Sequence, residues 1–144
     1  MPIATESERR RNTNPRKLYP VDPGLIQAFD SGGRWNVGHA LELVVFYELK
    51  RRGADVASVK TKGDLEVDFL ARYPGGREEL IQVCVDPSEP ATLGRQLAAL
   101  DAAGIEHPRA VRQLIVMDAS TAGRIGHPRT EPVAAPQWLV SSSP

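Results

Sequence analysis

Residues 64–84 read DLEVDFLARYPGGREELIQVC and predict a β-hairpin. Apolar and polar residues alternate on both sides of residues 74–76, which is the period of a β-strand. The Pro-Gly-Gly between the two runs is typical of the tight turn that joins two strands. If the middle residue of this turn is the centre of the hairpin, Asp68 faces Gln82 and Glu66 faces Cys84.

The two faces of this hairpin differ in chemistry. One face is expected to join the hydrophobic core and carries Val67, Phe69, Ile81 and Val83. The other face carries a polar row made of Glu66, Asp68, Gln82 and Cys84. This polar row is either a solvated surface or part of a site that needs oxygen atoms.

The remaining elements follow from the same kinds of pattern. Residues 37–52 predict a helix that ends at Gly53, and residues 91–103 predict a second helix that stops at Gly104. Two short strands are expected at 56–59 and 114–117, with a further short strand at 17–19 and helical turns at 25–29. Since a helix links the hairpin to the last strand, the expected class is α/β, with a mixed sheet flanked by helices.

Length and composition favour one cytoplasmic domain. The chain has 144 residues, of which 41% are hydrophobic and 25% charged, which is typical of a globular protein. We expect a flexible leader over residues 1–14 and a single domain over 15–144, with an irregular tail after 118 in which Trp138 packs on the body. No apolar run suits a membrane span or a secretory signal. One cysteine fits a reducing cytoplasm, and a formal charge of zero argues against a strongly basic nucleic-acid binder.

Glu42 suggests a site on the first helix. Its neighbours along the helix are apolar, and a carboxylate on a buried face needs a partner. If the helix packs on the polar row, Glu42 meets Asp68 and Gln82. Two carboxylates and an amide oxygen would form an oxygen-rich pocket that suits Mg²⁺. The alternative is a structural pairing of Glu42 with Arg51, Arg52 or a backbone amide.

The order of these residues resembles that of the PD-(D/E)xK nucleases. In that family a helix glutamate, a strand aspartate and the acid of a (D/E)-x-K strand hold a divalent metal, and the lysine helps to position and activate the attacking water. Here the matching residues are Glu42, Asp68 and Gln82, with Cys84 at the lysine position. The third acid has therefore become an amide and the lysine a thiol.

The match is closer to one branch of this superfamily. The strings KLYPVDPGL, VGHALELVVFYELKRRG, EVDFLARYPGG, LIQVCVD and TLGRQLAALDAAG resemble the C-terminal domain of unknown function of prokaryotic AAA+ ATPases. The resemblance spans about residues 16–117 and implies a restriction-endonuclease-like αβββαβ core. Members of this branch commonly carry IQVC or a similar string where a working nuclease has its acid and lysine. No GxxxxGK[ST] phosphate loop occurs, so neither ATP binding nor ATP hydrolysis is expected of this chain.

Three functions remain open from the sequence. The first is a catalytically degenerate nuclease-like domain that binds DNA, RNA, a protein or a second copy of itself. The second is an active Mg²⁺-dependent nuclease that uses Glu42, Asp68 and Gln82. The third is a protein-interaction module that regulates an ATPase. Arg95 and Gln96, at the start of the second predicted helix, are candidates for contact with a backbone phosphate, and a solvated helix face is the alternative.

Overall fold

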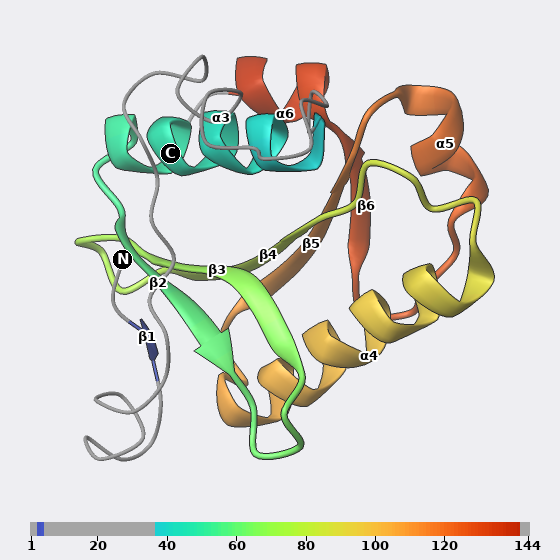
Figure 1. Cartoon of the computed structure of the whole chain (residues 1–144). Helices are drawn as coiled ribbons and strands as arrows, with labels where there is room; N and C mark the ends of the chain where they lie inside the picture. The colour runs from blue at the N-terminus through green and yellow to red at the C-terminus, as the bar shows by residue number, and fades with distance from the viewer. Residues whose placement is uncertain (1–2, 5–36, 142–144) are drawn as a thin grey trace, which may run out of the picture.

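The computed structural model describes residues 3–4 and 37–141 of the chain. Within these residues one mixed sheet has the strand order β1-β2-β3-β4-β5-β6 (Figure 1). Strands β2, β3 and β4 are antiparallel neighbours, whereas the β1–β2, β4–β5 and β5–β6 pairs are parallel. The strands are β1 (Ile3–Ala4), β2 (Asp55–Lys60), β3 (Glu66–Arg72), β4 (Glu78–Val83), β5 (Val111–Val116) and β6 (Glu131–Ala134). The helices are α3 (Val37–Arg51), α4 (Pro90–Glu106), α5 (Ala119–Arg124) and α6 (Ala135–Val140).

Helices cover both faces of the sheet, so the predicted α/β class with a mixed, helix-flanked sheet is confirmed. Helices α3 and α6 lie on one face, and α4 lies on the other (Figure 1). The core under α3 and α6 includes Val45, Leu49, Phe69, Ile81, Val83, Ile115 and Trp138. The core under α4 includes Val59, Val67, Leu70, Leu80, Cys84, Leu100 and Leu114. The central strands are therefore buried on both faces.

The predicted first helix and its end are confirmed. Helix α3 spans Val37–Arg51, and Gly53 follows it with a φ of +80°. The N–H of Ala54 donates to the carbonyl of Leu49, and the N–H of Gly53 donates to that of Lys50, each at 3.0 Å. This is the Schellman pattern, in which a left-handed glycine lets the chain turn back on the last carbonyls.

The predicted hairpin is also confirmed, in its expected register. Strands β3 and β4 pair through Phe69 with Ile81, and the pairing continues to Arg72 with Glu78. The N–H of Tyr73 donates to the carbonyl of Arg77 at 2.9 Å. Gly76 completes the turn with a φ of +87°, a conformation that glycine adopts without strain.

A β-bulge in β3 overturns part of the predicted face assignment. Ala57 pairs with Leu70 and Val59 pairs with Val67, so Asp68 and Phe69 together lie opposite one residue of β2. The extra residue shifts the alternation of side chains by one position. As a result Val67 lies under α4 with Leu70, whereas Phe69 keeps its predicted place in the other core. The face expected to be polar is a second core.

The second helix does not stop at Gly104 as predicted. Helix α4 runs from Pro90 to Glu106, and Gly104 is buried inside it. A Cβ atom at Gly104 would lie 2.1 Å from the guanidinium carbon of Arg112. Glycine at this position therefore leaves room for an arginine side chain from β5, and it is not a helix end.

The tail after residue 118 is regular, contrary to the prediction. Asp118 is the N-cap of helix α5, and its carboxylate accepts the N–H of Thr121 at 2.8 Å. Strand β6 pairs with β5, and α6 follows with Pro136 in its first turn, where the missing N–H costs nothing. Proline and glycine thus mark the starts and joints of short elements here. The predicted packing of Trp138 on the body is confirmed, because its side chain is buried.

Several predictions on the first third of the chain fall outside the described residues. The strand at 17–19, the helical turns at 25–29 and most of the leader at 1–14 belong to this group. Two residues of the expected leader, Ile3–Ala4, form β1 beside β2. Among the described helices, none combines the length and the apolar character that a membrane crossing requires.

Candidate functional site

Asp68 and Gln82 meet where β3 and β4 cease to pair. The side-chain oxygen of Gln82 accepts the N–H of Asp68 at 3.1 Å. In return, one carboxylate oxygen of Asp68 accepts the N–H of Val83 at 3.0 Å. Both side chains are buried, with exposed fractions of 6% for Asp68 and 7% for Gln82. We call this pair of side-chain-to-backbone hydrogen bonds the Asp68–Gln82 bracket.

The bracket replaces hydrogen bonds that the sheet cannot make. The pairing of β3 with β4 ends at Phe69 and Ile81, next to the bulge. Beyond it the backbone groups of Asp68 and Val83 would be buried without a ladder partner, which is costly. The two side chains supply the missing acceptors. The sequence pattern predicted that Asp68 and Gln82 lie next to each other, as they do. Their side chains form hydrogen bonds to the backbone of the neighbouring strand.

Cys84, at the position where the resemblance would place a lysine, is enclosed by the core under α4. Its exposed fraction is 2%, and its backbone N–H pairs with the carbonyl of Ile115 at 2.8 Å. Burial raises the pKa of the Cys84 thiol, and the nearby charge of Asp86 adds to this effect. A buried neutral thiol is a weak nucleophile and carries no positive charge toward a phosphate. Glu66, which the predicted register places opposite Cys84, is exposed at the start of β3.

Glu42 lies half-buried on α3, but α3 does not pack on the polar row as expected. Its buried residues Val45 and Leu49 join the core that contains Phe69. Side chains alternate along β4, so Gln82 lies on the same face as Leu80 and Cys84, which belong to the opposite core. The fold therefore does not direct the buried face of α3 at the side of β4 that carries Gln82.

Of the alternative partners expected for Glu42, the two arginines, Arg51 and Arg52, both bind Glu48. Arg51 donates from Nε and Arg52 from Nε to the Glu48 carboxylate, at 2.8 and 2.7 Å. The hydrogen bond from Arg51, with help from Arg52, lowers the pKa of Glu48 to about 2. Sequence reasoning missed Glu48, although its spacing of three and four residues from two arginines is typical of helix ion pairs.

The donor set at the bracket fits a divalent cation poorly. Mg²⁺ prefers carboxylate oxygens that keep their lone pairs for the metal and its waters. Here one oxygen of Asp68 and the oxygen of Gln82 accept backbone N–H groups. Within residues 3–4 and 37–141, no group of three or more His, Cys, Asp or Glu side chains is arranged to hold a metal ion.

The candidate phosphate contacts on α4 differ from each other. Arg95 is exposed, whereas Gln96 is half-buried. The side-chain oxygen of Gln96 is buried and has no hydrogen-bond partner in the described part of the chain. Both residues lie in the second turn of α4, a little later than the predicted start of that helix.

Sequence reasoning also missed a charged network between α4, β5 and the loop before β6. Asp101 accepts a hydrogen bond from Arg112 at 3.0 Å and contacts Nε2 of His127 at 3.2 Å. The other ring nitrogen of His127 accepts the N–H of Thr130 at 3.1 Å. His127 therefore carries its proton on Nε2 and donates to Asp101. These residues come from three distant segments, and no local pattern links them.

Comparisons of the chain with protein-family models, with curated proteins and with solved structures give no match.

Proposed function

We propose that this chain is a nuclease-like α/β domain without catalytic activity, which acts in the cytoplasm by binding a partner. The Asp68–Gln82 bracket is the observation that carries this proposal. Residues at the positions of two metal ligands accept backbone N–H groups across a bulge. The order of elements from α3 to β5, one helix, three strands, a helix and a strand, is compatible with the restriction-endonuclease-like core that the sequence resembles.

Metal-dependent cleavage of a phosphodiester needs a cation that stabilises charge on the phosphate and a water activated beside it. At the bracket, an amide stands where the third acid would be. A lysine would add a positive charge near the phosphate, but the residue at its position is the buried Cys84. The amide and the thiol would both weaken metal-dependent cleavage, so a binding function is favoured over catalysis.

A plasmid-nicking assay tests the absence of catalysis. Purified protein is incubated with supercoiled DNA and Mg²⁺ or Mn²⁺, beside Glu42→Gln and Asp68→Asn as variants of the family positions. We expect the native chain to produce no more nicked plasmid than either variant. Metal-dependent nicking that disappears in a folded Asp68→Asn protein would support the active nuclease and overturn our proposal.

The class of partner is tested by salt dependence. Nucleic-acid binding by phosphate contacts weakens steeply as salt rises, because counterions are released on binding. An electrophoretic shift of DNA or RNA that is lost between low and moderate salt would identify nucleic acid as the partner. Protein binding would instead leave the nucleic acid unshifted, and an immobilised domain would retain a specific protein after a salt wash.

A protein partner is the second candidate, and an exposed apolar stripe on α3 favours it. Val37, Val44 and Tyr47 are exposed by 39%, 40% and 36% of their surface. Their spacings of seven and three residues place them along one side of a helix. Replacement of Val44 by Glu should weaken retention of a protein partner and leave any nucleic-acid shift unchanged.

A further inference from the structure

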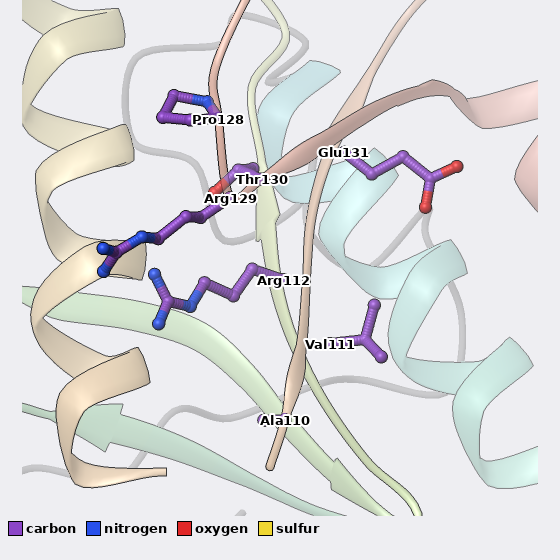
Figure 2. Close-up of a pocket in the computed structure, with 7 residues that line it drawn as sticks. All are labelled: Ala110, Val111, Arg112, Pro128, Arg129, Thr130 and Glu131. Atoms are coloured by element: carbon purple, nitrogen blue, oxygen red, sulfur yellow. The ribbon is translucent and has the colours of Figure 1, made fainter. Parts of the chain in front are cut away.

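A pocket of about 310 Å³ opens between the start of β5 and the loop that leads into β6 (Figure 2). Arg112 lines it from β5, and Arg129 and Thr130 line it from the loop. Figure 2 shows both guanidinium groups on the same side of the pocket, next to α4. In the β4–β5 ladder, Arg112 pairs with Leu80, whereas Gln82 pairs with Leu114. Neither Asp68 nor Gln82 lines the pocket, so the pocket is distinct from the Asp68–Gln82 bracket.

Arg112 is held in place from two directions. Its guanidinium lies against the backbone of Gly104, where any larger residue would collide with it. One of its terminal nitrogens donates to Asp101 at 3.0 Å, and only 13% of its side chain is exposed. An arginine fixed in this way has already lost most of its rotamer freedom, so it binds a ligand at a lower entropic cost.

Arg129 adds a second positive charge to this side of the pocket. It is exposed and forms no ion pair with any carboxylate among residues 37–141. The acidic residue of the neighbouring network, Asp101, is shared between Arg112 and His127. Glu131 also lines the pocket, but Figure 2 shows its carboxylate directed away from the two guanidinium groups. The side of the pocket next to α4 therefore carries an excess of positive charge.

Thr130 supplies the observation that points to a ligand. Its exposed fraction is 3%, and its buried hydroxyl oxygen has no hydrogen-bond partner among residues 3–4 and 37–141. A buried polar group without a partner costs about 1–3 kcal/mol, so native proteins rarely keep one without a reason. The loop around it is fixed, since His127 accepts the N–H groups of both Arg129 and Thr130 at 3.3 and 3.1 Å.

From this arrangement we infer that the pocket binds a phosphate-class oxyanion. Two guanidinium groups present parallel N–H donors that match the oxygens of a phosphate, and a hydroxyl can donate to a third oxygen. The volume of about 310 Å³ suits a phosphate group with a small remainder attached. The inference does not depend on the proposed function, and it concerns other residues.

A titration with inorganic phosphate tests the inference, with chloride at matched ionic strength as the reference. The readout is the NMR signals of the arginine Nε–H groups and of the Thr130 amide. We expect saturable shifts of the Arg112, Arg129 and Thr130 signals. Arg129→Gln should bind phosphate about tenfold more weakly, because one charge-assisted contact is lost. Arg109→Gln removes the same charge from the neighbouring loop outside the pocket, and it should bind like the native chain.

Thr130→Val is the second variant, and it separates binding from folding. Valine has the same shape without the unpaired hydroxyl, so the free protein should be at least as stable as the native chain while its phosphate affinity falls. Shifts that do not saturate, or equal losses in Arg129→Gln and Arg109→Gln, would overturn the inference by showing general charge screening. An unchanged affinity in Thr130→Val would remove the threonine from the site and overturn the proposed geometry.

A second ligand identifies the source of the phosphate. A short oligothymidylate without terminal phosphates offers only phosphodiesters. Saturable shifts of the same three signals with this ligand would show that the pocket holds a nucleic-acid backbone. Saturation with inorganic phosphate alone would identify a free phosphate or a phosphomonoester, and both results support the oxyanion site. The nicking assay does not involve these residues, so the two proposals can fail separately.

Discussion

Asp68 and Gln82 each accept a hydrogen bond from the backbone of the other's strand, at the end of the pairing between β3 and β4. The distances are 3.1 Å for the Asp68 N–H to Gln82 and 3.0 Å for the Val83 N–H to Asp68. A carboxylate and an amide thus take the place of two ladder carbonyls beside a bulge. This relationship assigns a structural task to two residues whose sequence pattern resembles a metal site.

The bracket predicts a loss of stability on Asp68→Ala. Alanine leaves the buried N–H of Val83 without an acceptor, and we expect the free energy of unfolding to fall by about 1–3 kcal/mol. Urea denaturation followed by circular dichroism measures this change. Asp55→Ala, at an exposed position on β2, is the matched control and should change stability by less than about 0.5 kcal/mol. Equal small effects at both positions would contradict the structural task of Asp68.

Glu48 predicts how stability depends on acid pH. Its pKa in the folded chain is about 2, below the ordinary carboxyl value, because Arg51 and Arg52 donate to it. A lowered pKa stabilises the fold above the ordinary value and loses this effect as the pH falls from about 4.5 to about 2. Glu48→Gln should remove a contribution on the order of 1 kcal/mol at pH 7, since solvent screens part of the network. The urea midpoints of the native chain and of the variant should converge as the pH falls from 7 to 2. If the midpoints still differ at pH 2, the lowered pKa of Glu48 is not the cause of the difference.

The raised pKa of Tyr73 predicts how the stability of the fold changes at alkaline pH. Burial, together with the negative charge of Glu79, raises the pKa of Tyr73 to about 12, and its hydroxyl donates to Glu79 at 2.9 Å. A raised pKa stabilises the neutral form, so stability should fall as the pH rises from about 10 to about 12. Absorbance at 295 nm should show one tyrosine that titrates late. In Tyr73→Phe that late step should vanish, and stability at pH 7 should fall by about 1–2 kcal/mol as Glu79 loses a donor. A late step that survives in the variant belongs to another tyrosine.

The close approach of Arg112 to Gly104 predicts a variant that folds normally but binds phosphate more weakly. Alanine is favoured over glycine inside a helix by about 1 kcal/mol, but its Cβ would collide with the guanidinium of Arg112. The far end of an arginine side chain can move, so we expect Gly104→Ala to keep the fold, with a melting temperature within a few degrees of the native chain. The displaced Arg112 should then bind phosphate about tenfold more weakly. Native-like phosphate affinity in Gly104→Ala would show that Arg112 does not contribute to the pocket.

Local chemistry in the sequence was sufficient to predict the hairpin and the first helix. The Pro-Gly-Gly turn fixes the register from Phe69 to Arg72, and Gly53 fixes the end of α3. The bulge was not predictable, because a single extra residue in β3 leaves the alternating pattern intact in the sequence. It moves Val67 to the other core, so the expected polar face became a buried one.

The sequence predicted which residues of the candidate site lie next to each other, but it could not predict which hydrogen bonds they form. The register placed Asp68 beside Gln82, but whether a carboxylate accepts a backbone N–H or holds a cation depends on geometry that no spacing reveals. Gly104 shows the same limit, since glycine at a helix end and glycine under an arginine look alike in the sequence. The contacts among Asp101, Arg112 and His127 join segments that only the folded sheet brings together.

Diffraction from crystals soaked in Mn²⁺ tests the central claim most directly, because the anomalous signal locates the metal without any assay of activity. The structural task of the Asp68–Gln82 bracket predicts that both hydrogen bonds to the backbone persist and that no manganese peak lies beside Asp68. A peak bonded to the carboxylates of Asp68 and Glu42, with the Val83 N–H released, would show a working metal site and contradict the account.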